Sequence, residues 1–371
     1  MSPSKRSPIQ KSAQPPSASL ETALRGVDDL LASVGLTHGT RRTRPIAGAK
    51  QSLPREKKSA ARPVPALPRP AQPIVLRVPA WKRHAWLVHG FSTRVGGVST
   101  VYSQPLGHSQ PVGELNLGYT ASDTRAHVNR NRELFLRALQ SGSASPTQKK
   151  NLVLLRQIHS GLVHRVEAAH LSSLRDDSIF AAGDGLLCAQ AGPLLGILTA
   201  DCLPVLVADT RQRIVAAFHA GWRGTVARVV ERGVGRMRAE FGSRPQDLTA
   251  AIGPGIGGCC YTVGDEVRAA FDAQFSYSPT LFHEVYDSDP IKEKYPLLFL
   301  TARAPGHSNL GPNLHLDLAE ANRRQLLDAG LQAEQIHPLH LCTACHTEQF
   351  FSHRASHGFT GRMLSVIGIS R

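Results

Sequence analysis

Two histidines and a cysteine stand at the ends of apolar runs in this sequence. Cys202 directly precedes the run Leu203 to Ala208, and His219 directly follows the run Ile214 to Phe218. His159 lies two residues beyond a further run of this kind. Short apolar runs between polar turns are typical of strands that are covered on both faces. Because adjacent strands bring their ends together, we expect the thiol and the imidazoles to meet in space.

Two imidazoles and one thiolate are a ligand set for catalytic zinc. Structural zinc normally has four protein ligands, whereas catalytic zinc has three and keeps one position open. The separations, 43 residues from His159 to Cys202 and 17 from Cys202 to His219, include no compact ligand pair. Spacing alone leaves a plainer interpretation open, because a buried cysteine is commonly a small hydrophobic residue. A third interpretation makes Cys202 a nucleophile and His219 its base.

Two arginines near glycines are candidates for binding phosphate. Arg94 lies in the segment Ser92 to Ser99, STRVGGVS, where backbone N–H groups and hydroxyls can wrap an anion. Arg223 follows the strand that ends at His219. A guanidinium suits phosphate because its planar fork binds two oxygens at once. An ordinary turn is the alternative for the first segment, in which we also expect Ser92 to contact the substrate.

Three further residues complete the predicted site. Asp201 adjoins Cys202, and we expect it either to orient an imidazole ligand or to form a hydrogen bond at the start of its strand. Asn116 lies in a polar turn and is a candidate for contact with ribose or another ligand. Gly257 belongs to the segment GPGIGG at 253–258, where glycines let the backbone approach a ligand closely.

Alternating strands and helices are predicted around these residues. Apolar runs indicate the strands, 3.6-residue periodicity indicates the helices, and a polar stretch at 276–314 indicates a surface excursion. The predicted strands are 74–78, 86–91, 152–157, 162–166, 186–188, 194–199, 203–208, 214–218, 249–252 and 363–369, and the predicted helices are 123–140, 224–241, 264–275 and 317–329.

The positive charge of the chain is concentrated near its N-terminus. The 371 residues carry a net charge of +15, of which residues 1–75 supply +9 from 13 Lys and Arg and 4 Asp and Glu. This uneven distribution argues against a core that binds nucleic acid specifically. Residues 1–75 are rich in Pro and Ser and poor in aromatics, which predicts a disordered arm with one short helix over 19–35.

Cysteine content and hydropathy indicate the compartment. Six cysteines and the lack of a recognisable secretory signal are typical of a protein in a reducing cytosol. No stretch reaches the ~18 continuous apolar residues that a membrane span needs. We therefore expect a cytoplasmic protein without a membrane span, and the sequence carries no signal for its oligomeric state.

A CxxC pair, Cys342 and Cys345, directly precedes His346. The segment CTACH matches the attachment pattern of c-type haem, but attachment needs an export route, for which no signal is visible. A zinc knuckle would need partner ligands at short spacing, and none is clear. We therefore expect Cys342 to be a wall residue of the pocket and Cys345 to have no role.

Ten motifs, in chain order, carry a resemblance to a known family. They are HGFSTRVGGVS, LNLG, RQIHS, ADCLPVL, HAGWRG, AIGPGIGGCCYTVG, LDLAEANRRQL, CT, FFSHR and TGR. Over residues 76–371 the chain closely resembles the YfiH-type laccase-domain family, also called multicopper polyphenol oxidases or purine nucleoside phosphorylases. The first 75 residues are outside the resemblance.

The resemblance implies a single domain over 76–371 with mixed α/β architecture, layered as an α-β-β-α sandwich with mixed sheets. It also implies one zinc ion held by His159, Cys202 and His219, with copper as the alternative metal. Family members phosphorolyse adenosine, inosine and methylthioadenosine to a free base and ribose 1-phosphate, and they deaminate adenosine. Purine nucleosides and phosphate are therefore the expected partners. Thr262 departs from an acidic residue common in the family, which puts substrate preference in question.

Functions of other classes stay open at this point. A laccase-like copper oxidase would need His-x-His pairs, and none of the 17 histidines lies two residues from another. A cysteine hydrolase acting in peptidoglycan-precursor editing would use Cys202 without a metal. A non-catalytic scaffold would work through its basic arm.

Overall fold

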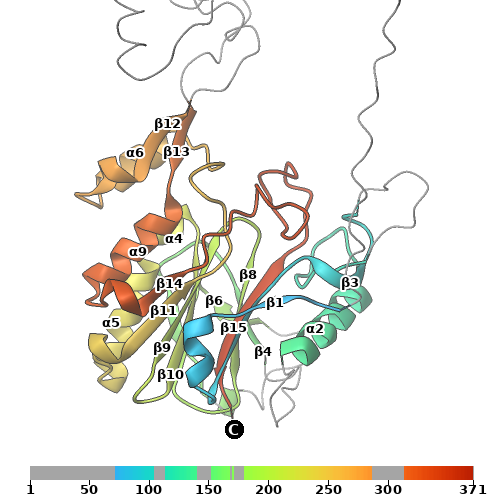
Figure 1. Cartoon of the computed structure of the whole chain (residues 1–371), viewed down its shortest axis with the longest axis horizontal. Coiled ribbons are helices and arrows are strands. Elements are labelled where there is room, and N and C mark those ends of the chain that lie inside the picture. The colour runs from blue at the N-terminus through green and yellow to red at the C-terminus, as the bar shows by residue number, and fades with distance from the viewer. Residues whose placement is uncertain are drawn as a thin grey trace, which may run out of the picture. The chain divides into compact units, whose positions relative to one another are not determined.

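The computed structural model describes residues 72–103, 113–139, 152–167, 169–170, 179–285 and 313–370 (Figure 1). The predicted arm, apart from its last residues, and most of the predicted excursion at 276–314 lie outside these ranges. Within them, two six-stranded sheets pack face to face, and helices cover their outer faces.

The first sheet combines strands from the two ends of the domain. One of its inner strands, at 363–369, comes from the C-terminal end and is antiparallel to both of its neighbours. The strands at 152–156 and 179–182 run parallel to each other. In spatial order the strands are β1 (Val75–Leu76), β2 (Leu87–Ser92), β15 (Met363–Ile369), β8 (Leu194–Thr199), β4 (Leu152–Arg156) and β6 (Ile179–Ala182).

The second sheet contains the apolar runs that flank the predicted metal ligands. Its inner strands are antiparallel, and only the outermost pair at each edge is parallel. In spatial order the strands are β14 (Ile336–Pro338), β11 (Leu248–Ile252), β9 (Leu203–Asp209), β10 (Ile214–Ala220), β7 (Gly185–Cys188) and β5 (Val163–Arg165).

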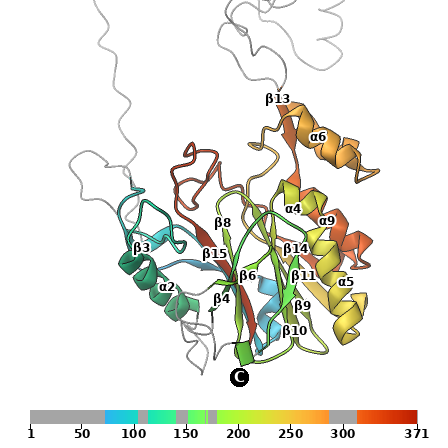
Figure 2. The ribbon, with the colours of Figure 1, turned by 180° about the vertical axis from the view of Figure 1, so that it is seen from behind.

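Helices cover the outer face of each sheet (Figure 2). Helix α2 (Arg125–Leu139) packs its apolar side chains onto the first sheet. Helices α4 (Trp222–Val226), α5 (Val229–Phe241) and α9 (Leu318–Asp328) lie on the second sheet. The predicted α-β-β-α sandwich with mixed sheets is therefore confirmed.

The core between the sheets is formed by the inward-facing residues of both. Leu155, Ile197 and Ile367 of the first sheet pack in one cluster with Leu206 and Val215 of the second. Side chains of a strand alternate between its two faces, so every second residue of β9 and β10 points away from the first sheet and toward the covering helices. This explains why their sequences are apolar throughout.

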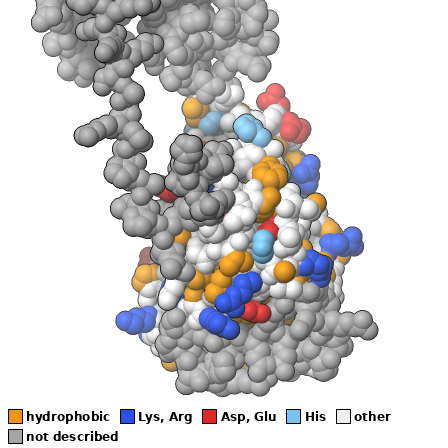
Figure 3. Space-filling model, turned by 90° about the vertical axis from the view of Figure 1, so that its right-hand side faces the viewer, with side chains coloured by type: hydrophobic (Ala, Val, Ile, Leu, Met, Phe, Trp, Pro, Cys, Tyr) orange, Lys and Arg blue, Asp and Glu red, His pale blue; other side chains and the backbone are white. Residues whose placement is uncertain are grey.

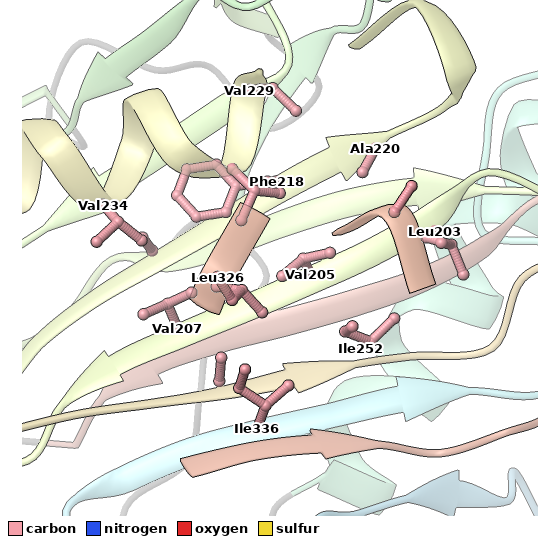
Figure 4. Packing of buried hydrophobic residues seen from close by; sticks show 14 of the residues in the cluster. Leu203, Val205, Val207, Phe218, Ala220, Val229, Val234, Ile252, Leu326 and Ile336 are labelled. Carbon is pink, nitrogen blue, oxygen red and sulfur yellow. The ribbon is translucent and has the colours of Figure 1, made fainter. Parts of the chain in front are cut away.

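The second core lies between β9, β10 and their covering helices (Figure 4). Phe218, Val205 and Val207 of the sheet contact Val234 of α5 and Leu326 of α9 in this cluster. All five are fully buried. Burial of such side chains contributes about 1.5–3 kcal/mol each.

One predicted helix is two helices in the structure. The pattern predicts a helix over 224–241, but α4 ends at Val226 and α5 begins at Val229. Arg228 between them has a left-handed backbone with φ of 57°. Its guanidinium donates to Glu231 and to the carbonyl of Gln274, which holds the break in place.

The remaining elements lie around the ends of the sheets. Strand β3 falls in a segment predicted as a loop, and its backbone pairs with Glu114 through isolated bridges. No helix of the described residues is both long and apolar enough to cross a membrane. These elements are β3 (Val95–Ser99), β12 (Phe282–Val285), β13 (Asn313–Leu316), α6 (Asp265–Asp272) and short 3-10 helices at Pro79–Arg83, Pro245–Asp247, Ser278–Leu281 and Ala333–Gln335.

Candidate metal centre

The structure brings together the three residues that the sequence analysis names as metal ligands. Nε2 of His159 lies 3.9 Å from Sγ of Cys202, and the rings of His159 and His219 are 4.9 Å apart. One ligand atom from each residue lies within 4.8 Å of the other two. A single ion can therefore contact a thiolate and two imidazoles at this place.

Strand register explains how two of these residues meet. In the antiparallel ladder of β9 and β10, Leu203 pairs with Ala220, so the residue before Leu203 faces the residue after Ala220. These residues are Cys202 and Gly221. His219 is the next-to-last residue of β10, so it lies within one pair of the same end of the ladder.

Asp184, the residue before the neighbouring strand β7, fixes His219. The backbone N–H of His219 donates to the carbonyl of Asp184 at 2.7 Å, and its Nδ1–H donates to Oδ1 of the same residue at 2.8 Å. Both side chains are buried. Because Nδ1 is occupied, Nε2 is the nitrogen of His219 that can bind an ion.

The same carboxylate shapes the loop that carries His159. Its oxygens accept hydrogen bonds from the backbone N–H groups of Ile158, His159 and Ser160, and from the hydroxyl of Ser160. His159 has a left-handed backbone with φ of 59°, which is uncommon outside glycine. Asp184 thus positions two of the three ligands at once.

These hydrogen bonds determine the protonation of Asp184. Burial alone would raise its pKa, but the bonds from His219 and Ser160 outweigh burial and lower the pKa to about 2. The group is therefore a carboxylate at neutral pH. A carboxylate that accepts from a ligating imidazole raises the basicity of the ligand nitrogen.

Cys202 and His219 shift each other's protonation in opposite directions. Burial opposes charge on both residues, but their mutual attraction lowers the pKa of Cys202 and raises the pKa of His219. Hydrogen bonds from His159 to the sulfur and from His219 to Asp184 act in the same directions. The sulfur is therefore held as the thiolate, the form that binds metals.

Gly221 leaves the space that the ligands need. A Cβ atom at this position would lie 2.8 Å from Sγ of Cys202 and 3.1 Å from Cδ2 of His159. A side chain at this position would therefore displace both ligands. The thiolate, the oriented imidazoles and this close backbone fit a zinc ion, and the same donor set also accepts copper.

The cluster opens into a cavity of about 590 Å³. Besides the three ligands, the C-terminal segment contributes Arg362 and His353, and β8 contributes Thr199. The hydroxyl of Thr199 is buried and has no hydrogen-bond partner among the described residues. The other lining residues are Gly118, Tyr119, Thr120, Ala121, Leu155, Gln157, Leu198 and Ala200.

The family model for multi-copper polyphenol oxidoreductase laccase matches residues 88–370. This chain belongs to that laccase-domain family. The purine nucleoside phosphorylase YlmD of Geobacillus stearothermophilus is 34% identical over 286 residues, which are 76% of this chain and 94% of that protein. The purine nucleoside phosphorylase YfiH of Escherichia coli is 32% identical over 292 residues, which are 79% and 98% of the two chains.

Solved structures of the family share this fold. The crystal structure of YlmD from G. stearothermophilus superposes with a TM-score of 0.61 at 31% identity, over 80% of this chain and 96% of that chain. The crystal structure of the hypothetical protein YfiH from Bacillus licheniformis gives a TM-score of 0.63 at 31% identity, with the same coverage of both chains.

The arginines predicted to hold phosphate do not line the laccase-domain cavity. Nε of Arg94 lies 2.5 Å from Oε2 of Glu114, a carboxylate that is 1% exposed, and its Nη1 donates to the carbonyl of Thr347. The guanidinium of Arg223 lies over the ring of Trp222, 4.2 Å from its centre. Arg94 therefore neutralises a buried charge, and a phosphate site at either arginine stays a prediction.

Asp201 does not contact either imidazole ligand. Its Oδ1 accepts from the hydroxyl of Thr343 at 2.6 Å, and its Oδ2 accepts from the backbone N–H of Arg354 at 2.6 Å. The alternative prediction, a hydrogen-bonding role at the start of its strand, describes it better. Asp201 fastens the C-terminal segment beside Cys202, while Asp184 orients the imidazole.

The three predicted substrate contacts also have structural partners. Oγ of Ser92 accepts from the backbone N–H of Leu364, and Ser92 is 2% exposed. Asn116 is fully buried, and its Oδ1 accepts from the backbone N–H of Arg362 at 2.9 Å. Asn116 therefore acts on the cavity through Arg362. Gly257 lines a different cavity, beside Cys342.

Sequence reasoning missed Asp184, Arg362, His353 and Thr199 as cavity or supporting residues. Arg362 and His353 lie in the motifs TGR and FFSHR, which carried the resemblance without an assigned role. Asp184 had a weaker signal, since it directly precedes the buried strand β7. Its role depends on the pairing of β7 with β10, which cannot be predicted from local sequence patterns.

Proposed function

We propose that this chain is a purine nucleoside phosphorylase. It cleaves the N-glycosidic bond of adenosine, inosine or methylthioadenosine with phosphate, and it releases the base and ribose 1-phosphate. The observation that carries the proposal is a single cavity that holds both the His159–Cys202–His219 cluster and the guanidinium of Arg362. The names of the relatives from G. stearothermophilus and E. coli support the same reaction.

His159, Cys202 and His219 hold the metal in this proposal. Zinc bound by three protein ligands keeps an open position, acts as a Lewis acid and lowers the pKa of a bound water to about 7. The lining favours zinc over a blue-copper centre, because blue-copper sites commonly add an axial methionine to His₂Cys. No methionine is among the residues that line the cavity.

Arg362 is the proposed phosphate-binding residue. Asn116 accepts from its backbone N–H, and its Nη1 donates to the carbonyls of Thr360 and Gly361. These contacts fix the direction of the guanidinium and leave its other nitrogens without a partner among the described residues. Phosphorolysis needs a positioned anion and compensation of its charge, and a fixed arginine supplies both.

Thr199 and His353 are the proposed contacts for the nucleoside. Rotation of the Thr199 side chain would bring its buried, unpaired hydroxyl into contact with a ribose hydroxyl in the cavity and give it a hydrogen-bond partner. His353 is the residue of the cavity that can exchange a proton with the departing base without being a proposed metal ligand.

Deamination of adenosine is the second activity in the proposal. A water molecule adds its oxygen at C6 of the purine, the C6–N bond breaks, and the reaction needs a proton donor for the departing ammonia. None of the described residues that line the cavity is a carboxylate. His353 therefore takes the acid role in this reaction as well.

The test is incubation of the purified chain with adenosine, with and without phosphate. Phosphate-dependent release of adenine together with ribose 1-phosphate supports the phosphorylase, and inosine formed without phosphate supports the deaminase. Removal of the metal with a chelator should stop both. A rate that persists after chelation would instead favour a metal-free cysteine hydrolase, and oxidation of phenols by copper-loaded protein would favour the laccase-like alternative.

A further inference from the structure

A second cluster of potential ligands lies in the same domain, outside the site described above. Sγ of Cys345 lies 3.4 Å from Sγ of Cys259 and 3.3 Å from Sγ of Cys260. Cys342 completes the group, and the four sulfur atoms all lie within 4.8 Å of one another. All four thiols are free in the structure.

The fold itself brings these cysteines together. Strands β11 and β14 are parallel neighbours at the edge of the second sheet, so they end on the same side. The pairing continues beyond both strands, where Gly255 forms a parallel bridge with Cys342. Cys259 and Cys260 follow the first strand, and the CxxC pair follows the second. The partner ligands that the sequence analysis did not find are 82 or more residues away in the chain.

We propose that Cys259, Cys260, Cys342 and Cys345 bind a structural zinc ion. Zinc with four thiolates is tetrahedral with Zn–S distances of about 2.3 Å, which places the sulfur atoms about 3.8 Å apart. Two of the separations, 3.3 and 3.4 Å, are slightly shorter than this value, and all of them lie within 4.8 Å. Four protein ligands leave no open position, so this ion stabilises structure and does not act on a substrate.

Gly257 supports the cluster in two ways. Its backbone N–H lies 3.2 Å from Sγ of Cys342, a hydrogen bond that orients the sulfur and favours its charged form. A Cβ atom at Gly257 would lie 3.2 Å from both Sγ of Cys259 and Cβ of Cys342. The glycine that was predicted to approach a substrate therefore approaches the cysteines.

A disulfide is a poorer account of the four residues. A disulfide needs an S–S distance of about 2.05 Å, and it joins two sulfur atoms only. Cys345 is almost equally distant from Cys259 and Cys260, so a bond to either would leave the other thiol and Cys342 unused. One ion uses all four sulfur atoms and requires only small shifts in their positions.

The ion would join two loops that border the first metal centre. The CxxC loop contains Thr343, which donates to Asp201, and the loop with Cys259 is held by a bond from the N–H of Ile256 to the carbonyl of Asp201. Asp201 directly precedes Cys202. The second ion therefore steadies the cavity wall, and this inference does not depend on the reaction that the cavity carries out.

Zinc stoichiometry tests the proposal on the full chain. Protein purified under reducing conditions without added metal is measured by elemental analysis and native mass spectrometry. We expect two zinc ions per chain in the wild type and one in Cys345→Ser. Cys188→Ser is the matched control, because Cys188 is the one cysteine outside both clusters, and it should retain two ions.

A variant with the second cluster intact makes the test independent of folding defects in Cys345→Ser. Cys202→Ala should bind a single zinc ion. X-ray absorption of this variant should show four sulfur neighbours at about 2.3 Å and no nitrogen or oxygen neighbour. Its cobalt-substituted form should show the strong thiolate-to-metal charge-transfer absorption of a sulfur-rich site.

Four results would overturn the assignment. They are a Cys202→Ala protein without zinc, a zinc shell that contains nitrogen or oxygen, iron in place of zinc, and a disulfide between Cys345 and Cys259 or Cys260 in the reduced wild-type protein.

Discussion

Nδ1 of His219 lies 2.8 Å from Oδ1 of Asp184, and the same carboxylate accepts from three consecutive backbone N–H groups at residues 158–160. One acidic side chain thus joins a strand-end histidine to the loop that carries a second histidine. The arrangement assigns the orienting role to Asp184, a residue that is not adjacent in sequence to any of the three ligands.

Replacement of Asp184 should weaken the metal centre without removing a ligand. We expect Asp184→Asn to lower zinc affinity about 10–100-fold, the usual effect of losing the partner of a ligating histidine. Competition with a chromophoric chelator measures the change. The matched control is Asp209→Asn, because Asp209 is equally buried and accepts backbone N–H bonds at the opposite end of β9. Equal losses in the two variants would assign Asp184 a general structural role only.

Gly221 offers a test of the space around the ligands. The added Cβ in Gly221→Ala would lie 2.8 Å from Sγ of Cys202, so we expect at least a tenfold loss of zinc affinity in a folded protein. Gly235→Ala is the control, since a Cβ there meets nothing within 4 Å and alanine is favoured within helix α5. Unchanged zinc affinity in Gly221→Ala would mean that the ligands move away without cost.

Arg362 and Arg94 should respond differently to replacement by glutamine. Arg362→Gln removes the charge in the cavity, and we expect the KM for phosphate to rise about 10–100-fold, because hydrogen bonds to charged groups contribute about 1.5–3 kcal/mol. Initial rates at varied phosphate concentration measure this effect.

Arg94→Gln should instead destabilise the fold by about 3–5 kcal/mol, because it removes the positive charge that compensates the buried Glu114 carboxylate. Denaturant unfolding measures this loss, and the KM for phosphate should stay near the wild-type value. A raised KM for phosphate in Arg94→Gln together with an unchanged KM in Arg362→Gln would instead place the phosphate site at Arg94.

The stability of the domain should depend on pH through His89. Burial, with a smaller contribution from the charge of Arg77, lowers the pKa of His89 to about 4, and Nε2 accepts from the backbone N–H of Val78. An unfolded histidine has a pKa of about 6.5, so the unfolded state binds the proton more readily. The contribution of His89 to stability is therefore complete above pH ~6.5 and is lost as the pH falls towards 4, by up to about 3 kcal/mol.

His89→Gln keeps an acceptor for Val78 but cannot take up a proton. The difference in unfolding free energy between the wild type and this variant should therefore shift between pH ~7 and ~4.5. Cys202→Ala is the suitable background for both proteins, since it removes the pH dependence of the first metal centre. A difference that stays constant with pH would show that His89 does not titrate in this range.

Much of the architecture follows from local patterns in the sequence. The unbroken apolar runs of β9 and β10 predict buried strands, and the residues at their ends include two of the three metal ligands. The family resemblance supplies the layering of the sheets, which periodicity alone does not. The break at Arg228 escaped prediction because a left-handed residue without glycine leaves no clear mark in the sequence.

The supporting residues depend on contacts between distant segments. Asp184 reaches His219 only because β7 pairs with β10 in one register, and Arg362 enters the cavity only because Asn116 holds its backbone. The charge of Arg94 looked available, but Glu114 neutralises it from another loop. The four cysteines show the same limit, since a parallel strand pair joins segments that are far apart in the chain.

The distribution of positive charge on the surface bears on possible partners. Lys and Arg side chains on the visible described part of the surface in Figure 3 stand at separate places and form no continuous band on that face. Helix α9 illustrates a local cause, because Arg323 and Arg324 both pair with Glu320. The expectation that the domain does not bind nucleic acid specifically stays a prediction.

Because of the arrangement of the strands, an ion at the first metal centre would affect the stability of the sandwich. His159 lies where the chain leaves β4 of one sheet for β5 of the other, and Cys202 lies where it leaves β8 for β9. No hydrogen-bonded strand pair among the described residues connects the two sheets. An ion at these crossings would act as a cross-link at the open rim of the sandwich, so the melting temperature of the domain should rise with the concentration of free zinc.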